Sequence, residues 1–259
     1  MNIVVLLKMV PDVVEELAVA ADGKALDTEY LRMILNDSDN HALEEALLLK
    51  ERYGGTVSLL APEAPEVDDA LFTALAKGAD RAVKIADSAA TQSTRKLTAL
   101  VAQALATANL LPADFILTGT QAIDDLDGLL APLLAQRLGW PHLAVVNQVK
   151  VEGGIATVTK EFAGGMRAVF EVKLPAVLGI QSAEKPPRYV PVARVRAAMK
   201  WRPIESVAIS APVEPAQLEL RNIIKPSASA HVEMLEGPPE AVVDKLCDLL
   251  AARGVLQGE

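Results

Sequence analysis

An acidic turn between a predicted strand and a predicted helix is the part of this sequence that bears most directly on chemistry. Residues 118–139, TGTQAIDDLDGLLAPLLAQRLG, predict a strand end, a turn with a glycine, and then a helix. Such helix starts bind phosphate in many α/β proteins, because their backbone N–H groups are unpaired and Gly128 permits close approach. Asp125 and Asp127 flank that point, and unit charges about 4 Å apart interact by roughly 1 to 4 kcal/mol. The turn could therefore be an altered phosphate site. The alternative, which the residue chemistry of Asp127 favours, is that Asp127 is a helix N-cap.

Standard nucleotide and catalytic motifs are missing from the sequence. No G-x-G-x-x-G follows the first predicted strand, and no Walker-type G-x-x-x-x-G-K-[ST] occurs. No G-x-S-x-G elbow occurs either. Glu44 and Glu45 follow a predicted helix start, and we interpret them as solvated carboxylates rather than as an acid/base pair. We therefore expect no self-contained catalytic set and no enzyme activity of this chain alone.

The composition favours an α/β protein with an aliphatic core. Hydrophobic residues make up 51% of the 259 residues, and aromatic residues only 3%. An aliphatic core of this kind suits parallel strands that are buried on both faces of a sheet. The length is enough for one large α/β domain with extensions or for two small domains.

Charge and rare residue types exclude several classes of function. The net charge is −9, and phosphate backbones need clustered Lys and Arg, so no nucleic-acid role is expected. Cys247 is the single cysteine, which excludes an internal disulfide and a cysteine-rich metal site. His41, His142 and His231 lie far apart in the sequence, so no metal centre is expected. Because no apolar run reaches the roughly 20 residues of a spanning helix, we expect a cytoplasmic protein without membrane insertion.

Strands and helices alternate through the first half of the chain. This alternation predicts an open parallel sheet with helices on both faces. The polar run at residues 36–39 supplies side chains that suit a helix N-cap. The expected strands are residues 3–7, 56–60, 82–85 and 115–118, and the expected helices are residues 41–53, 67–77, 91–108 and 128–138.

The second half of the chain has a different sequence pattern. Gly153-Gly154 and Gly164-Gly165 separate alternating apolar and polar runs, which predicts antiparallel hairpins. Residues 183–226 are rich in proline and basic residues, which predicts an extended arm, and residues 238–253 predict an amphipathic terminal helix. We divide the chain into an α/β unit with a hairpin extension, residues 1–182, and an arm with its helix, residues 183–259. The arm and helix either cover a partner surface or pack back on the same domain.

A binding crevice is expected at one edge of the predicted sheet. In open parallel sheets, ligands bind beyond the carboxyl ends of the strands, where the strand order reverses. The segments that reach this edge are residues 6–11, 36–39, 60–64 and 118–130. They predict a nucleotide-sized crevice whose character depends on the acidic turn.

Several stretches, in order along almost the whole chain, point to one family. They are LLKMVPD (6–12), LNDSDNHALEEALLLKE (35–51), ALFTALAKGADRAV (70–83), ILTGTQAIDD (116–125), GGMRAVFEVKLPAV (164–177) and PPRY (186–189). Together with the helical tail, they resemble the beta subunit of electron-transferring flavoproteins. ALAKGADRAV and TGTQAIDD are the most specific of these stretches.

The resemblance implies a fold, a partner and cofactors. The fold would be of the adenine-nucleotide alpha-hydrolase-like type. The chain would form a heterodimer with an alpha subunit that holds a redox-active FAD, and the pair would pass electrons from a dehydrogenase to an acceptor. The beta subunit usually buries an AMP, which a second FAD replaces in flavin-bifurcating relatives. A bifurcating subunit and a non-redox scaffold of the same fold remain the alternatives.

The resemblance also implies cofactor-binding positions, some of which differ here from the family pattern. The turn after QAIDD has Asp127-Gly128-Leu129-Leu130 in place of Asn-Gln-Thr in AMP-binding relatives, so hydroxyl and amide donors to phosphate are lost. The family Pro-Phe is Asp37-Ser38, and the small-Gly-Pro turn is replaced at residues 62–65. We therefore expect AMP to bind weakly or not at all. The candidate cofactor-binding residues are Leu6, Lys8, Asn36, Gln121, Ala122, Ile123, Asp124, Asp127, Gly128, Leu129 and Leu130.

Two further differences concern docking to a redox partner. Arg167 stands where the family usually has an acidic residue in a GG-x-E hairpin. The loop before PRY usually presents a leucine, and an apolar anchor contributes about 1.5–3 kcal/mol when fully buried. Its loss predicts a different or dedicated redox partner. The equivalent run here is Ser182, Ala183, Glu184 and Lys185.

Overall fold

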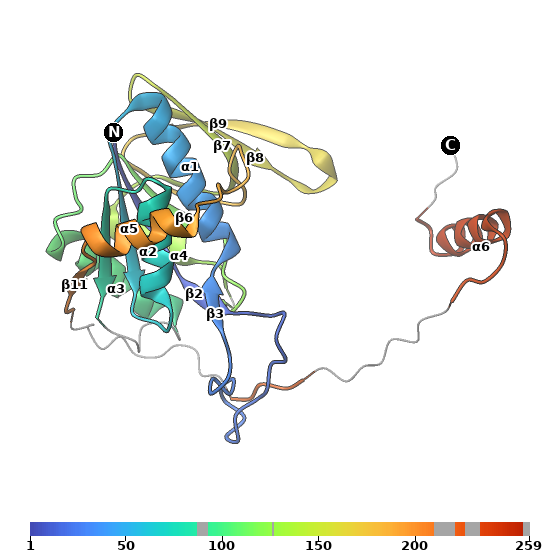
Figure 1. The fold of residues 1–259 in the computed structure, drawn as a ribbon. Helices are drawn as coiled ribbons and strands as arrows, with labels where there is room; N and C mark the ends of the chain where they lie inside the picture. Colours follow the sequence, from blue (N-terminus) through green and yellow to red (C-terminus); the bar gives the residue numbers. More distant parts are fainter. Residues whose placement is uncertain (87–92, 126, 210–220, 226–233, 256–259) are drawn as a thin grey trace.

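The protein is a mostly parallel α/β structure built on one large sheet (Figure 1). The computed structural model describes residues 1–86, 93–125, 127–209, 221–225 and 234–255. The large sheet has the strand order β11-β5-β4-β1-β6-β10-β7-β8-β9, and β2 pairs with β3 in a separate antiparallel ribbon. The strands are β1 (Asn2–Leu6), β2 (Met9–Pro11), β3 (Met33–Leu35), β4 (Thr56–Pro62), β5 (Arg81–Ile85), β6 (Phe115–Gly119), β7 (His142–Glu152), β8 (Ile155–Glu161), β9 (Arg167–Lys173), β10 (Ala176–Ile180) and β11 (Glu205–Val207).

Helices cover both faces of the sheet because the strands are apolar on both faces. Along β1, Ile3 and Val5 belong to one core, and Val4 and Leu6 belong to the other. The first core receives α1 and α2, and the second receives α3 and α4. The helices are α1 (Asp37–Tyr53), α2 (Val67–Lys77), α3 (Thr94–Thr107), α4 (Leu130–Leu138), α5 (Val192–Trp201) and α6 (Pro239–Ala252). The predicted α/β class is confirmed.

The strand order reverses at β1. This strand pairs in parallel with β4 on one side and with β6 on the other. The chain therefore first builds the sheet toward β4 and β5 and then crosses to β6. Loops that leave the carboxyl ends of β1 and β6 diverge at such a point and leave room between them. This is the edge at which the sequence places the crevice.

The predicted hairpins are confirmed. Strands β7, β8 and β9 pair antiparallel in sequence order. Both turns use a Gly-Gly pair, and all four glycines have positive φ, between 56° and 79°. Residues with side chains rarely adopt this conformation, so glycine at these positions permits the tight connections.

Helix α1 begins earlier than the sequence predicts. We expected residues 36–39 to cap a helix that starts at His41, but the helix already includes Asp37. Asn36 occupies the N-cap position and makes no side-chain cap hydrogen bond, so the capping interpretation is wrong. Instead, Asp39 is turned toward the ends of β1 and β6, where it accepts two backbone hydrogen bonds.

Part of the expected arm folds back onto the main sheet. Residues 192–201 form α5, whose Ala198 joins the core beside α2. Residues 205–207 form β11, which pairs in parallel with β5 at the edge of the sheet. The expectation of an extended conformation is therefore wrong for these residues. The terminal amphipathic helix is confirmed as α6, which Figure 1 shows apart from the sheet and its helices. The division of the chain at residue 182 stays a prediction.

Candidate functional site

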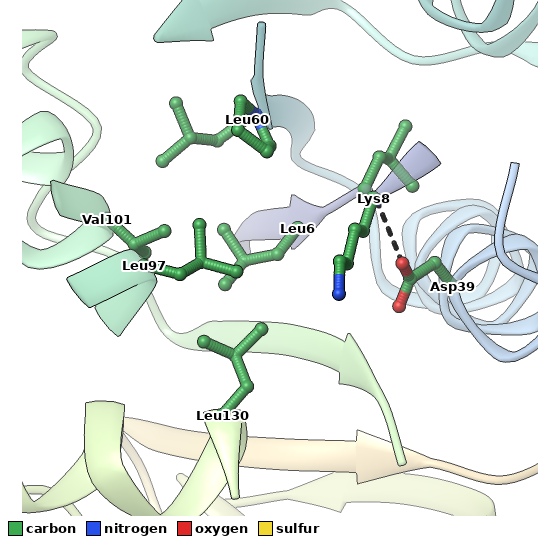
Figure 2. A pocket seen from close by; sticks show the side chains of 9 residues that line it. Leu6, Lys8, Asp39, Leu60, Leu97, Val101 and Leu130 are labelled. Atoms are coloured by element: carbon green, nitrogen blue, oxygen red, sulfur yellow. Dashed lines mark hydrogen bonds between the residues drawn. The ribbon is translucent and has the colours of Figure 1, made fainter. Parts of the chain in front are cut away.

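A narrow pocket lies at the carboxyl ends of β1 and β4, beside residues of α1, α3 and α4 (Figure 2). The volume open to the centre of a water-sized sphere is about 10 Å³, which is about what one water molecule needs. The part of the expected crevice that these residues line is therefore narrow. The lining residues are Leu6, Leu7, Lys8, Asp39, Leu60, Pro62, Leu97, Val101 and Leu130.

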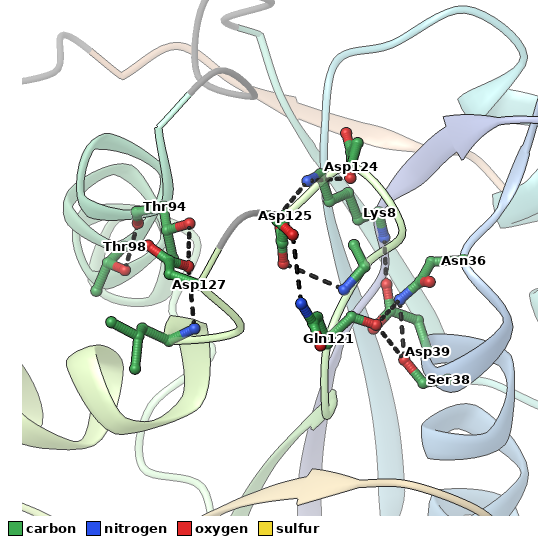
Figure 3. A network of polar contacts seen from close by, with 12 residues as sticks. Lys8, Asn36, Ser38, Asp39, Thr94, Thr98, Gln121, Asp124, Asp125 and Asp127 are labelled. Atoms are coloured by element: carbon green, nitrogen blue, oxygen red, sulfur yellow. Dashed lines mark hydrogen bonds and ion pairs between the residues drawn. The ribbon is translucent and has the colours of Figure 1, made fainter. Parts of the chain in front are cut away.

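Lys8 is the buried cation of this site. Its Nζ donates to Asp124 Oδ1 and to Asp125 Oδ1, both at 2.7 Å (Figure 3). The exposed fractions of the side chains are 6% for Lys8, 31% for Asp124 and 12% for Asp125. Burial opposes the charge of Lys8, but the hydrogen bonds and charges of the two carboxylates outweigh it, so the pKa of Lys8 is raised. Lys8 is therefore charged at physiological pH, and its charge is neutralised by the chain itself.

Asp39 joins the ends of the two central strands. Its Oδ2 accepts from Lys8 N–H at 2.9 Å, and its Oδ1 accepts from Gly119 N–H at 2.7 Å. A Cβ at position 119 would lie 2.1 Å from Ser38 Oγ and 2.9 Å from the backbone nitrogen of Asp39. Only glycine therefore allows the start of α1 to approach β6 this closely. Full burial raises the pKa of Asp39 to about 7, although the two N–H donors and the charge of Lys8 oppose the shift.

We expect Asp39 to give the protein a pH-dependent stability. Its pKa is raised from 3.8 to about 7 on folding, so the folded state holds a proton that the unfolded state has lost between these values. Stability linked to Asp39 is therefore full below about pH 4 and is lost as the pH rises through about 7. The free energy of unfolding of the wild type, compared with that of Asp39→Asn, should fall by roughly 1 kcal/mol for each unit of pH increase between about pH 5 and 7.

Urea unfolding at a series of pH values measures this difference. The Asn side chain must turn its amide toward one of the two N–H donors, which lowers stability at every pH and does not change the slope. Asp22→Asn, at an exposed aspartate of the loop after β2, is the control. The difference in free energy of unfolding between this control and the wild type should not change with pH across this range. A flat difference for Asp39→Asn as well would show that Asp39 is ionised throughout.

The turn after β6 packs against the start of α1. Gln121 O accepts from Ser38 Oγ at 2.8 Å and from Asn36 Nδ2 at 3.2 Å (Figure 3). Ala122 is buried, and its N–H donates to Asp125 Oδ2 at 3.2 Å. Ile123 is 63% exposed. The structure therefore brings the predicted positions 36, 121, 122 and 124 together around Lys8 and leaves Ile123 exposed.

Asp127 is not a helix N-cap. Helix α4 begins at Leu130, and its N-cap residue, Leu129, makes no side-chain cap hydrogen bond. Asp127 Oδ1 instead accepts from Leu129 N–H at 3.1 Å and from Thr94 Oγ1 at 2.9 Å. The carboxylate therefore ties the turn to the start of α3. Gly128 has φ of +59°, which favours glycine at this point of the turn.

Glu44 and Glu45 are buried, and the prediction that they are solvated is wrong. Only 3% and 1% of their surface is exposed. Glu45 accepts from the N–H groups of Val149 and Glu184, at 3.1 and 2.9 Å. Glu44 accepts three guanidinium hydrogen bonds and one backbone hydrogen bond from Arg188. Burial raises the pKa of Glu45, against the two backbone hydrogen bonds that lower it. The two glutamates thus hold the docking segment, residues 182–188, on α1.

The candidate docking residues therefore have fixed surroundings. Ala183 N–H donates to His41 Nδ1 at 3.1 Å, and Glu184 pairs with Arg52 at 2.7 Å. Lys185 is exposed, and Ser182 is partly exposed. Arg167 lies far from them in sequence, on β9, where its 69% exposed side chain is 3.5 Å from Glu161.

Three site residues were not among the candidate cofactor-binding residues, although two of them lie in segments expected at this edge. Asp125 and Asp39 take part in the central network, and Thr94 contributes from α3. The adjacent acidic residues at 124 and 125 were a usable signal for Asp125. No sequence signal pointed to Thr94, because its contact with Asp127 depends on how α3 and α4 pack against each other.

A wider, open hollow lies between α2 and β3. Its volume is about 350 Å³, within the range of ligand pockets. Arg32 and Lys77 line it together with the acidic Glu66 and Asp69, so the lining does not favour one sign of charge. Lys77 Nζ already donates to Asn40 Oδ1 at 2.6 Å.

The described residues hold neither a metal-binding cluster nor a membrane span. Across the described ranges, no three His, Cys, Asp or Glu side chains form a group that could hold a metal ion. No helix in the described part of the chain is both long enough and apolar enough to cross a membrane.

Comparisons with known proteins agree with this fold. Residues 24–212 match the family described as "Electron transfer flavoprotein domain". A protein named electron transfer flavoprotein subunit beta from Clostridium acetobutylicum is 33% identical over 252 residues, which cover 95% of this chain and 93% of the relative. Proteins of the same name from Syntrophomonas wolfei and Bacillus subtilis are 34% and 29% identical, over 88% and 96% of this chain and 87% and 97% of their own.

Proposed function

The chain belongs to the electron transfer flavoprotein family and corresponds to its beta subunit, and from this premise we propose that it completes the FAD site of an alpha subunit. The pair would carry electrons between a dehydrogenase and an acceptor. The match to a relative named as a beta subunit over 95% of the chain is the observation that carries this proposal. The redox chemistry would come from FAD, and the part of this chain would be to bind and position its partner.

The pocket at β1 supports a flavin held mainly by the other subunit. Its volume is about 10 Å³ beside Lys8 and the leucines that line it, which does not favour a second dinucleotide there. A nucleotide in this crevice is not needed for the proposed role. With one cysteine and no long apolar run, a cytoplasmic location fits such a carrier.

Exposed apolar side chains on two elements support a partner surface. On α6, Val243, Leu246 and Leu249 are 56%, 47% and 37% exposed, and no residue of this helix is buried. On the hairpin of β8 and β9, Met166 and Val169 are 67% and 65% exposed. An unpaired amphipathic helix gains stability when its apolar face is covered. We infer that α6 lies on the alpha subunit.

The docking segment supports a redox partner unlike the usual one. Ser182, Glu184 and Lys185 offer polar groups where the family pattern has a leucine, and hydrogen bonds to α1 hold the segment in place. A partner that docks here would therefore be recognised by polar and charged contacts.

Co-expression with an alpha subunit tests the proposed function. We expect a complex that shows the visible absorbance of a flavin, with one FAD for each pair of chains. Val243→Asp combined with Leu246→Asp should weaken the complex at least 100-fold, because two apolar side chains lose about 1.5–3 kcal/mol each. Flavin content should fall with the loss of the complex.

Lys245→Asp is the matched control, since it places an acid beside the same face and removes no apolar side chain. It should leave the complex and its flavin almost unchanged. A stable complex without a flavin band would favour a non-redox scaffold of the same fold. Two flavins for each pair would favour a bifurcating subunit.

A further inference from the structure

The turn after β6 has the donors of an anion site. A phosphate at a strand end and helix start needs unpaired N–H groups and often a cation. The donors here are Lys8 Nζ, the N–H groups of Ala122 and Leu129, and the hydroxyl of Thr94. They come from the segments after β1 and β6, from the start of α3 and from the residue before α4, and Figure 3 labels Lys8 and Thr94 among them. An AMP of the kind that the family resemblance implies would need such donors for its phosphate.

Each of these donors already has a carboxylate of the same chain. Asp124 and Asp125 take up Lys8 Nζ at 2.7 Å, and Asp125 also accepts from Ala122 N–H at 3.2 Å. Asp127 accepts from Leu129 N–H at 3.1 Å and from the Thr94 hydroxyl at 2.9 Å. The donors and acceptors thus satisfy each other without a ligand. The residues present do not fit an AMP phosphate.

We infer that the Asp127 carboxylate takes the place of a nucleotide phosphate at the start of α4, so that this crevice excludes AMP. The inference rests on the proposed function, because a nucleotide is expected in this crevice only if the chain has that role. A phosphate that entered would have to displace Asp127 from Leu129 N–H and the Thr94 hydroxyl and would then lie close to its carboxylate. Like charges at such separations weaken binding by a factor of about ten or more.

The apolar residues that line the pocket also disfavour AMP binding. Leu6, Leu97, Val101 and Leu130 meet beside Lys8, and the volume left between them is about 10 Å³ (Figure 2). The pocket is therefore filled with side chains at its apolar end and with carboxylates at its polar end.

Nucleotide extraction and AMP titration test the inference on the full chain co-purified with its alpha subunit. Acid extraction of the wild-type complex should release well under one AMP for each chain. Calorimetric titration should give a Kd for AMP above about 1 mM. Asp127→Ser removes this carboxylate, keeps a hydroxyl that can contact phosphate, and leaves both ion pairs of Lys8 intact. This variant should bind AMP at least about tenfold more tightly than the wild type.

Two controls make the result decisive. Asp22→Ser removes the same charge from an exposed loop and should not change AMP binding. Asp127→Asn removes the charge and keeps an acceptor for Leu129 N–H, so it replaces Asp127→Ser should that variant not fold. Stoichiometric AMP in the wild-type complex would overturn the inference. So would a folded variant that binds AMP no better than the wild type. Flavin absorbance of the same samples tests the proposed function separately, because AMP release does not depend on it.

Discussion

Replacing Lys8 with methionine is expected to lower the free energy of unfolding by about 3 kcal/mol at neutral pH. Methionine preserves the length and the apolar stem but leaves Asp124 and Asp125 without their cation. Breaking a buried ion pair by removing one partner typically costs about 3–5 kcal/mol. Asp124 is 31% exposed and can turn toward solvent, which keeps the expected loss at the low end. Urea unfolding followed by circular dichroism measures it.

A second substitution separates the charge effect from packing. Asp125→Asn in the Lys8→Met background removes the buried charge that was left unpaired, so it should recover part of the lost stability. Lys24→Met, at an exposed lysine, should change stability by less than about 0.5 kcal/mol. If Asp125→Asn lowers stability equally in both backgrounds, the charges are not coupled, and the central role of Lys8 is wrong.

Glu44→Gln is expected to lower the free energy of unfolding by roughly 3 kcal/mol and to release the docking segment. Glu44 is 3% exposed and receives four hydrogen bonds from Arg188. Glutamine keeps the size but loses the charge and one acceptor oxygen, so the guanidinium keeps only Glu51 as a charged partner. Urea unfolding gives the energy. Trypsin cleavage after Arg188, detected by mass spectrometry, reports the release of the segment.

Glu51→Gln is the matched control on the same helix. Glu51 also pairs with Arg188, but its side chain is 56% exposed. Pairs with an exposed partner contribute about 0–1 kcal/mol, so this variant should unfold and be cleaved almost like the wild type. Equal effects of the two substitutions would show that burial of Glu44 does not decide how the segment is held.

The fold could largely be predicted because its signals are local. Apolar runs such as those of β1 and β6, glycines after helices, and the paired glycines of the hairpins specify elements through short-range chemistry. The same local rules failed where a tertiary contact decided the outcome. Residues 192–201 look like an arm, yet they form α5 because α2 offers them a surface. No spacing within that segment indicates this packing.

The site divides in the same way. The sequence alone was enough to place residues 6–8, 36–39 and 118–130 at one edge of a parallel sheet, because strand ends and helix starts follow from the apolar pattern. It could not tell which donor each aspartate binds, or that Glu44 and Glu45 are buried, because these outcomes depend on groups up to 144 residues apart. Burial and pairing are properties of the packed chain: a carboxylate on a helix is solvated or enclosed according to what the rest of the fold lays over it.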